Sequence, residues 1–213
     1  MIEVKKSVTE IGFRLPFILF EQVKAWEYSI DQLVFEEQLE TGSFKGKFRV
    51  SPAILPMMHM AQEQGKIMPY YGAGGSSGCC IYSFQINDDK CKFQVHHSVA
   101  GEFLVLDLEI KKLDPIEPLV RKTEIQFSFL PYVTDEPLEQ PWTGERNQTL
   151  ICKIFDQEYE NLKQWQHWVD EEALTSRYIY QFGQVSMGAT GFSIKVQDTK
   201  TGNIVDITDY DNW

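Results

Sequence analysis

From residue 80 onward, apolar and polar residues alternate one by one along the chain. The alternating segments cover residues 80–86, 91–99 and 104–110, and short turns at 87–89 and 100–102 separate them. Successive side chains of a strand point to opposite faces, so a period of two indicates strands with one buried face. Three such strands joined by tight turns predict an antiparallel meander.

The same alternation returns in the second half of the chain. It predicts further strands at 125–129, 150–155, 178–185, 192–197 and 204–207. The polar run 198–203, between the last two, fits a tight hairpin turn with Gly202 in the left-handed position. The stretch 131–146 carries three prolines and several acids, so it is expected to be irregular.

Apolar positions spaced three and four residues apart predict helices. The clearest of these covers about 157–174, with Asp156 as its cap. A second helix is expected to enter at Ser51-Pro52, because Ser caps free N–H groups and Pro tolerates the first helical position. It is expected to stop at Gly65, since glycine commonly ends a helix.

The first 50 residues show mixed periods. A helix is expected to start at Ser29 and to end at 41–43, and a short strand is expected at 44–50. Strands joined by short turns, with two to three helices, predict a single α+β domain over residues 1–213. Its sheet should be largely antiparallel, a meander plus a C-terminal hairpin. The pattern leaves open whether residues 1–50 pack on this sheet or form a loosely attached subregion.

The composition supports a folded domain and limits its partners. Hydrophobic residues make up 43% and aromatic residues 13% of the chain, which supplies a packed core and excludes wholesale disorder. The formal net charge is −11 and the isoelectric point is about 4.8. An acidic surface repels phosphate backbones and anionic lipids, so neither nucleic acid nor a membrane is expected as a partner. A basic protein would be attracted and steered in.

Targeting and metal-binding patterns point to a cytoplasmic protein without a cofactor. The first apolar run, 15–20, contains Pro16 and is too short for a signal-peptide core or a membrane span. The four cysteines form no C-x-x-C pair and are expected to stay reduced. His59 lies among methionines on a helix that spreads them apart, and the acids of 198–211 lack calcium-loop spacing, so no metal is expected.

Residues 70–80 combine flexible backbone, hydroxyls, thiols and aromatic rings. The candidate loop residues are Tyr70, Tyr71, Gly74, Gly75, Ser76 and Ser77. A phosphate-binding loop needs Lys and Ser or Thr after the last glycine, and both it and a dinucleotide fingerprint need a following helix. Here two cysteines and a strand follow, which excludes both. A lid, a partner contact and a plain linker are the interpretations left open.

A cysteine nucleophile is the alternative that this region allows. Cys79 and Cys80 precede one strand, and His96 and His97 lie on the next. A turn centred on residue 88 would place Cys80 opposite His96 and Cys79 opposite His97, where an imidazole could activate a thiol. This alternative predicts a small-ligand-binding protein or a cysteine-dependent enzyme that uses loop 72–80. The competing interpretation is that these side chains fill a half-buried sheet.

The leading interpretation is an acidic protein-interaction module and not a catalyst. The candidate anchors are aromatic and acidic residues, namely Trp142, Trp165, Trp168, Glu171, Glu172 and Tyr210. Such a surface would cover a positively charged site on a basic partner, with charge speeding encounter and aromatic anchors slowing release. Inhibitors of basic toxins or nucleases, such as bacterial immunity proteins, share this bulk profile. A homo-oligomer without separate activity is a third interpretation.

Overall fold

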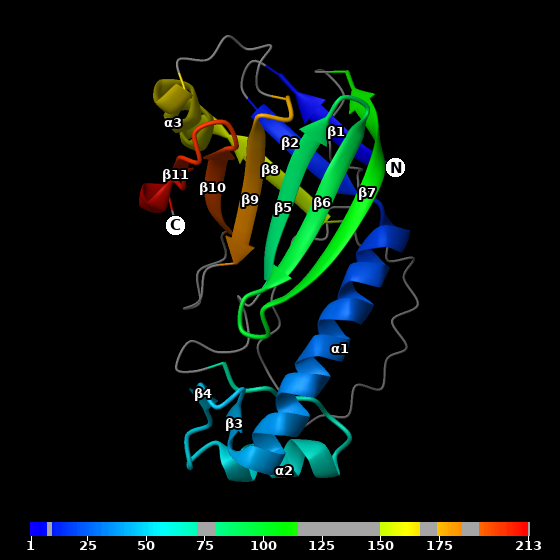
Figure 1. Cartoon of the computed structure of the whole chain (residues 1–213), viewed down its shortest axis with the longest axis vertical. Coiled ribbons are helices and arrows are strands. Elements are labelled where there is room, and N and C mark those ends of the chain that lie inside the picture. The colour runs from blue at the N-terminus through cyan, green and yellow to red at the C-terminus, as the bar shows by residue number, and fades with distance from the viewer. Residues whose placement is uncertain (8–9, 72–79, 115–149, 167–173, 185–191, 213) are drawn as a thin grey trace.

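The computed structural model describes residues 1–7, 10–71, 80–114, 150–166, 174–184 and 192–212 (Figure 1). These residues contain a nine-stranded sheet and three α-helices, α1 (Phe17–Thr41), α2 (Leu55–Glu63) and α3 (Asp156–Gln166). The strands of the sheet are β1 (Ile2–Lys6), β2 (Glu10–Leu15), β5 (Cys80–Asn87), β6 (Lys90–His97), β7 (Glu102–Leu113), β8 (Leu150–Phe155), β9 (Tyr178–Gln184), β10 (Phe192–Asp198) and β11 (Ile204–Asp206). A separate hairpin pairs β3 (Ser43–Phe44) with β4 (Phe48–Arg49).

The sheet is largely antiparallel, as the alternation predicts. Its strand order is β11-β10-β9-β5-β6-β7-β1-β2-β8. Within the described residues β1 pairs with β7 in parallel and the other neighbours pair antiparallel. The meander β5-β6-β7 and the hairpin β10-β11 are confirmed, and so is the α+β fold class. The predicted strand 125–129 and the irregular stretch 131–146 lie outside the described residues.

Residues 2–6 and 10–15 form two strands that the mixed pattern did not predict. β1 is inserted between β7 and β2, and β2 pairs on its other side with β8. In β2 the residues Ile11, Gly12 and Phe13 are buried in succession. Three consecutive buried residues break the period of two by which a half-buried strand is recognised.

Helix α1 begins twelve residues before the predicted start at Ser29, which was wrong. Pro16 precedes the helix, and its carbonyl accepts hydrogen bonds from the N–H groups of Leu19 and Phe20 at 3.1 and 3.0 Å. The hydroxyl of Ser29 donates to the carbonyl of Trp26 and caps no helix end. The predicted end is confirmed, because Gly42 follows the helix with a φ of 74°, a backbone angle that favours glycine.

Helix α2 also begins later than predicted. The backbone carbonyl of Ser51, and not its hydroxyl, accepts the N–H groups of Ile54 and Leu55. Residues 52–54 form a turn, and the helix itself runs from Leu55 to Glu63, two residues before Gly65. Among the described residues, no helix combines the length and the apolar character that crossing a membrane requires.

The C-terminal hairpin has the predicted turn. Gly202 has a φ of 74°, in the left-handed region. Asp198, the last residue of β10, is 5% exposed and accepts hydrogen bonds from Nε and Nη2 of Arg177 at 3.2 and 2.8 Å. The Arg177 guanidinium holds the pKa of this carboxyl well below its usual range. This two-bond ion pair ties the start of β9 to the end of β10.

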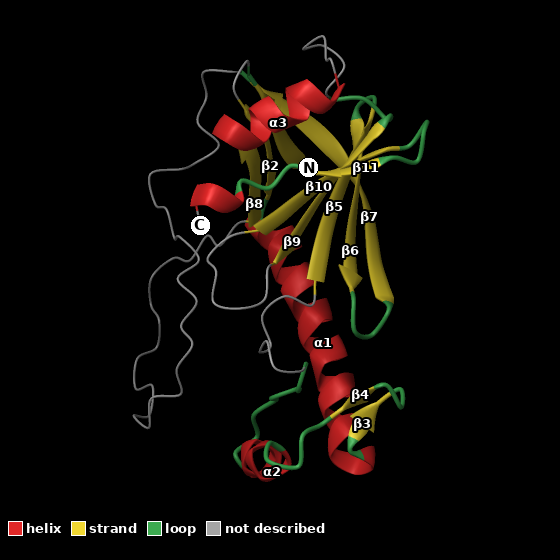
Figure 2. Ribbon diagram, turned by 90° about the vertical axis from the view of Figure 1, so that its left-hand side faces the viewer, coloured by secondary structure: helices red, strands yellow, loops and turns green. Residues whose placement is uncertain are grey.

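The curled sheet encloses the main core. Phe13 of β2 lies at its centre, stacked on Phe84 of β5 at 4.5 Å between ring centroids and packed edge-on against Phe182 of β9. Phe20 and Val23 on the first turns of α1 enter the same core. Figure 2 shows α1 continuing past the edge of the sheet, with β3, β4 and α2 at its far end. Two smaller apolar clusters hold this end together.

Candidate functional site

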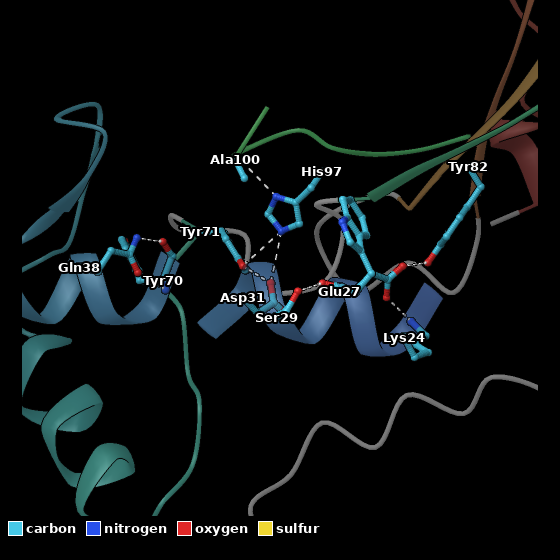
Figure 3. A network of polar contacts seen from close by, with 11 residues as sticks. Lys24, Glu27, Ser29, Asp31, Gln38, Tyr70, Tyr71, Tyr82, His97 and Ala100 are labelled. Carbon is cyan, nitrogen blue, oxygen red and sulfur yellow. Dashed lines mark hydrogen bonds and ion pairs between the residues drawn. The ribbon is translucent and has the colours of Figure 1, made fainter. Parts of the chain in front are cut away.

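A row of buried and half-buried polar side chains on α1 joins the helix to the sheet (Figure 3). Glu27, Asp31 and Gln38 are spaced four and seven residues apart, so they lie on one face of a helix with 3.6 residues per turn. Glu27 and Asp31 accept hydrogen bonds from residues that are distant in the sequence, and Gln38 exchanges a pair of bonds with the backbone of one. A buried polar group without a partner destabilises a fold, so these paired polar residues hold α1 in a fixed position against the segments it contacts. We call the three contacts the joint.

The first contact in this row is a phenol–carboxylate hydrogen bond. Glu27 is 9% exposed, and its Oε1 accepts the hydroxyl proton of Tyr82 across 2.7 Å. Its Oε2 accepts a hydrogen bond from Nζ of Lys24 at 2.6 Å. Burial raises the pKa of the Tyr82 hydroxyl well above its ordinary value, and the charge of Glu27 raises it further. The phenol therefore stays protonated and serves as a donor.

The second contact is a cluster of Asp31, Tyr71 and His97. His97 is 1% exposed, and its Nε2 lies 3.3 Å from Oδ1 of Asp31 and 3.5 Å from the Tyr71 hydroxyl. The hydroxyl of Tyr71 donates to the same Asp31 oxygen. Nδ1 of His97 accepts the N–H of Ala100 at 3.1 Å, so the proton of the neutral ring belongs on Nε2, facing Asp31.

The third contact clamps the backbone of Tyr70. Nε2 of Gln38 donates to the Tyr70 carbonyl at 2.7 Å, and Oε1 of Gln38 accepts the Tyr70 N–H at 2.8 Å. Gln38 is fully buried, and this pair of bonds satisfies its amide. Tyr70 and Tyr71 are thereby both fixed to α1 immediately before the glycine-rich stretch.

The structure places part of the predicted loop at this joint. Tyr70 and Tyr71 are half-buried against α1, and Cys80 begins β5 as the cross-strand partner of His97. The two described ends of the glycine-rich segment therefore meet near His97. The remaining predicted loop residues and one thiol lie outside the described residues, namely Gly74, Gly75, Ser76, Ser77 and Cys79.

The predicted pairing of cysteine with histidine was wrong by one residue. Cys80 lies opposite His97, and His96 lies opposite Ile81 on the other face of the sheet. The turn consists of two residues, Asp88 and Asp89, so its centre falls between them and not on residue 88.

The two imidazoles of β6 are engaged with other residues. Both ring nitrogens of His97 are engaged, by Ala100 on one side and by Asp31 on the other. His96 stacks on Phe103 with ring centroids 4.3 Å apart, on the face away from Cys80. Burial lowers the pKa of His96, and the neighbouring His97 acts in the same direction. A thiol needs such a base within hydrogen-bond reach to become a useful nucleophile.

An acidic surface with exposed aromatic rings forms where α3 meets the C-terminal segment. Tyr210, in the short 3₁₀ helix η2 (Tyr210–Asn212), is 56% exposed, and Phe155 at the end of β8 is 47% exposed. The Tyr210 hydroxyl donates to Asp206 at 3.1 Å. The acids linked to these two residues by hydrogen bonds or by charge are Asp156, Glu158, Asp206, Asp209 and Asp211. We call these seven residues the acidic surface.

Glu158 connects the two halves of the acidic surface. Its Oε2 accepts the N–H of Phe155 at 3.5 Å, and a backbone hydrogen bond also links it to Asp209. Burial raises the pKa of Glu158 to about 7, and the charges of Asp209 and Asp156 act in the same direction. A carboxylate that is half-buried among other acids is electrostatically unfavourable for the isolated chain.

Of the predicted partner-binding residues, Trp165 and Tyr210 lie in the part of the chain that the structure describes. Tyr210 is exposed on the acidic surface, whereas Trp165 on α3 is half-buried and packs against the main core. Trp142, Trp168, Glu171 and Glu172 lie outside the described residues.

Several residues of both sites were not singled out from the sequence. They are Glu27, Asp31, Gln38, Tyr82, Phe155 and Glu158. A signal for the α1 residues existed in the spacing of polar side chains at four and seven along an otherwise apolar helix face. Among the described residues, no group of three or more His, Cys, Asp or Glu side chains is arranged to hold a metal ion.

Comparisons with known proteins give no family. No protein-family model matches the chain, and neither a curated protein nor a solved structure matches it.

Proposed function

We propose that this chain is a protein-binding module whose acidic surface engages a basic partner. The observation that carries the proposal is the exposure of Tyr210 and Phe155 among five acids, at 56% and 47%. A few side chains supply most of the binding energy in a protein interface, Tyr, Trp and Arg more often than others, and surrounding charges raise the rate of encounter. The net charge of −11 steers a basic protein toward the chain over a longer range.

The environment of Glu158 favours binding of a cation at the acidic surface. Burial raises the pKa of this carboxyl most, and the charges of Asp209 and Asp156 raise it further. A lysine or arginine side chain placed between these acids would relieve that repulsion and favour ionisation. The module would act by occlusion, as an inhibitor or immunity-type protein does when it covers a positively charged site. A cytoplasmic location completes the proposal and agrees with Cys80, Cys91 and Cys152, three described cysteines that form no disulfide.

The test uses the full chain immobilised on a sensor and a panel of basic folded proteins, nucleases among them. Binding is measured at about 50 mM and about 500 mM salt, because screening weakens attraction between opposite charges. We expect at least one panel protein to bind at low salt and to dissociate at high salt. Tyr210→Ala should increase its dissociation rate about tenfold, as the loss of an aromatic anchor does. Failure of every panel protein to bind contradicts the proposal.

A charge-matched control separates the acidic surface from net charge. The double variant Asp156→Asn and Asp211→Asn removes two exposed acids from the acidic surface. The control double variant Glu40→Gln and Glu63→Gln removes two exposed acids at the other end of the molecule, at the ends of α1 and α2 (Figure 1). The first variant should lower the association rate more than the second. Equal losses would mean that attraction is spread over the whole chain, and the proposed surface would be rejected.

A further inference from the structure

The end of α1 that lies away from the sheet carries a stretch of chain without acids. Residues 41–62 contain no Asp or Glu, although the whole chain has 31 of them. The same stretch contains Lys45, Lys47 and Arg49, all exposed. It holds the hairpin β3-β4 and most of α2, and we call it the basic lobe. Figure 2 shows the basic lobe at the far end of α1, past the edge of the sheet.

The hairpin of the basic lobe is firmly anchored. Its turn contains Lys45 and Gly46, which both have a positive φ, of 48° and 65°. Phe44 and Val50 on either side of the turn are 5% and 7% exposed and belong to the two smaller apolar clusters. Nζ of Lys45 donates to the carbonyl of Ala100, in the turn between β6 and β7. The basic side chains are therefore presented by a fixed backbone.

Two of the three basic side chains have no compensating charge. Within the described residues, the acids that contact the hairpin are Glu37 and Glu102, and both contact Lys45. Glu37 accepts its backbone N–H at 2.6 Å, and Glu102 lies 3.9 Å from its Nζ. The charged groups of Lys47 and Arg49 form no hydrogen bond or ion pair with any described residue. These two cations are available to an anionic partner.

Apolar side chains are exposed at the same end of the molecule. Phe48, between Lys47 and Arg49, is 37% exposed, and Met57 and Met60 on α2 are 49% and 54% exposed. Methionine is unbranched and polarizable, so it adapts to irregular apolar surroundings. A surface with both cations and exposed apolar groups is complementary to a target that is anionic outside and apolar beneath. An anionic lipid bilayer has this structure.

The net charge of the chain does not cancel the attraction of the basic lobe. A net charge of −11 makes an anionic membrane an unexpected partner for the chain as a whole. At physiological ionic strength, however, charges are screened beyond about 8 Å. Helix α1 alone has 25 residues and therefore spans about 37 Å. Because α3 and its acids lie beyond the sheet from the basic lobe (Figure 1), they act weakly on a membrane at the lobe.

We propose that the basic lobe docks on an anionic lipid bilayer, with its cations at the headgroups and its exposed apolar side chains at the boundary of the acyl chains. A projecting tip suits a flat surface, whereas an amphipathic peptide helix is held in a groove. Nucleic acid would engage the cations and the Phe48 ring but not the methionines. So few contacts support weak, reversible binding and not permanent anchoring.

Co-sedimentation of the full chain with lipid vesicles tests the proposal. One set of vesicles is pure phosphatidylcholine and the other contains about 30% phosphatidylserine, each at about 2 mM lipid. We expect the chain to bind the anionic vesicles at about 50 mM salt. Binding should be at least about tenfold weaker at about 500 mM salt, and also when phosphatidylserine is omitted.

Charge-matched variants test the two cations. Lys47→Gln with Arg49→Gln should weaken binding to the anionic vesicles at least about tenfold, because each basic residue near the surface adds to the attraction. The control is Lys90→Gln with Lys92→Gln, two exposed lysines of β6 whose removal changes the net charge equally. The control should bind as the wild type does. Urea unfolding of each variant establishes that it is folded.

A second pair of substitutions tests the apolar part of the contact. Met57→Ser with Met60→Ser keeps the charge and should weaken binding about tenfold, because less apolar surface enters the bilayer. Ile204→Ser is the control, since Ile204 on β11 is 57% exposed and lies outside the basic lobe. It should leave binding unchanged.

The vesicle proposal and the proposed function can fail separately. Asp156→Asn with Asp211→Asn, which removes acids from the acidic surface, should not weaken binding to vesicles. A loss of vesicle binding in that variant would place the membrane contact elsewhere and reject the basic lobe.

Three further outcomes would overturn the proposal. One is a chain that stays in solution with the anionic vesicles at about 50 mM salt, where screening is weak. Another is an equal loss of binding in the Lys47 and Arg49 variant and in its Lys90 and Lys92 control. The third is retention of a single-stranded oligonucleotide of about 20 nucleotides by a chain that binds no vesicles, which would assign the cations to nucleic acid.

Discussion

The hydroxyl of Tyr82 on β5 donates a hydrogen bond across 2.7 Å to the carboxylate of Glu27 on α1. Both residues are buried, at 7% and 9% exposure. This contact fixes the rotation of α1 on the sheet, because a turn of the helix about its axis would leave a buried carboxylate without its donor. With this rotation, Asp31 and Gln38 on the same helix face contact His97 and Tyr70.

Tyr82→Phe should lower the free energy of unfolding by about 1–3 kcal/mol, because it removes the phenol donor and leaves the Glu27 carboxylate with Lys24 alone. Urea unfolding at neutral pH measures the loss. Tyr28 lies on α1, as Glu27 does, and is 57% exposed. Tyr28→Phe removes the same hydroxyl oxygen and should change the free energy of unfolding by less than about 0.5 kcal/mol. Equal effects of the two changes would show that the Tyr82–Glu27 bond does not stabilise the fold.

His97 and Asp31 should contribute unequally to stability. His97→Phe keeps the buried volume but leaves the Ala100 N–H without its acceptor, which should cost about 1–3 kcal/mol. Asp31→Ala should cost about 1 kcal/mol or less, because 37% of its side chain is exposed to solvent. Urea unfolding gives the two values. Hydrogen exchange at the Ala100 amide should accelerate in His97→Phe and stay near the wild-type rate in Asp31→Ala; the reverse order would contradict the assigned bond.

Glu158 should make the fold less stable as pH rises. Its folded-state pKa is about 7 against an ordinary value of 4.5, so the folded chain holds the proton more tightly than the unfolded chain between these values. Stability is therefore highest below about pH 4.5, as far as this group is concerned, and falls toward pH 7. Glu158→Gln should remove this slope and stabilise the chain at pH 8 by about 1–2 kcal/mol, allowing for partial exposure.

Urea unfolding of wild type and Glu158→Gln at several pH values between 5 and 8 measures the Glu158 effect. Glu160→Gln on the exposed side of α3 is the control, and its stability should follow the wild-type pH dependence. A wild-type slope that persists in Glu158→Gln would assign the titration to another group.

Cys91 and Cys152 should resist alkylation in the folded chain. Both are buried, at 0% and 1% exposure, and burial raises the pKa of Cys91 to about 12 and that of Cys152 also well above its ordinary value. Reaction needs an exposed thiolate, so labelling with iodoacetamide near pH 7.5 should be at least about 100-fold slower than in urea. Peptide mass spectrometry assigns the sites. Rapid labelling of Cys80 in the same experiment would favour the cysteine-chemistry alternative over the binding module.

The local pattern predicted those elements in which one face is buried and neighbours are joined by short turns. Tyr82, Phe84 and Ile86 are buried on alternate positions of β5, so the period of two reports the burial faithfully. The period of two did not reveal β2, because three consecutive residues are buried there. The helical period did not reveal the start of α1, where Glu27 and Gln38 occupy buried positions. A pattern of apolar residues cannot reveal an element whose buried face contains polar groups with distant partners.

The same limit applies to the candidate sites. The sequence singled out Tyr71, His97 and Cys80, because unusual residue types stand close together there, but it assigned the histidine opposite Cys80 incorrectly. A difference of one position in the turn at Asp88-Asp89 exchanges His96 for His97, and successive residues of a strand point to opposite faces. On the acidic surface the sequence singled out Tyr210 but not Phe155. The exposure of a ring at the end of a strand depends on which segments pack beside it.

The order of apolar and polar residues by itself determined the meander, the C-terminal hairpin, the acidic character and the α+β class. These properties depend on neighbours within a few residues or on sums over the whole chain. The tertiary structure alone decided which polar groups meet. Tyr82 and Glu27 are 55 positions apart and His97 and Asp31 are 66 apart, and these pairs form because the curl of the sheet brings β5 and β6 against one face of α1. Contacts between distant segments depend on how whole elements pack, and that packing is not encoded in any short stretch of sequence.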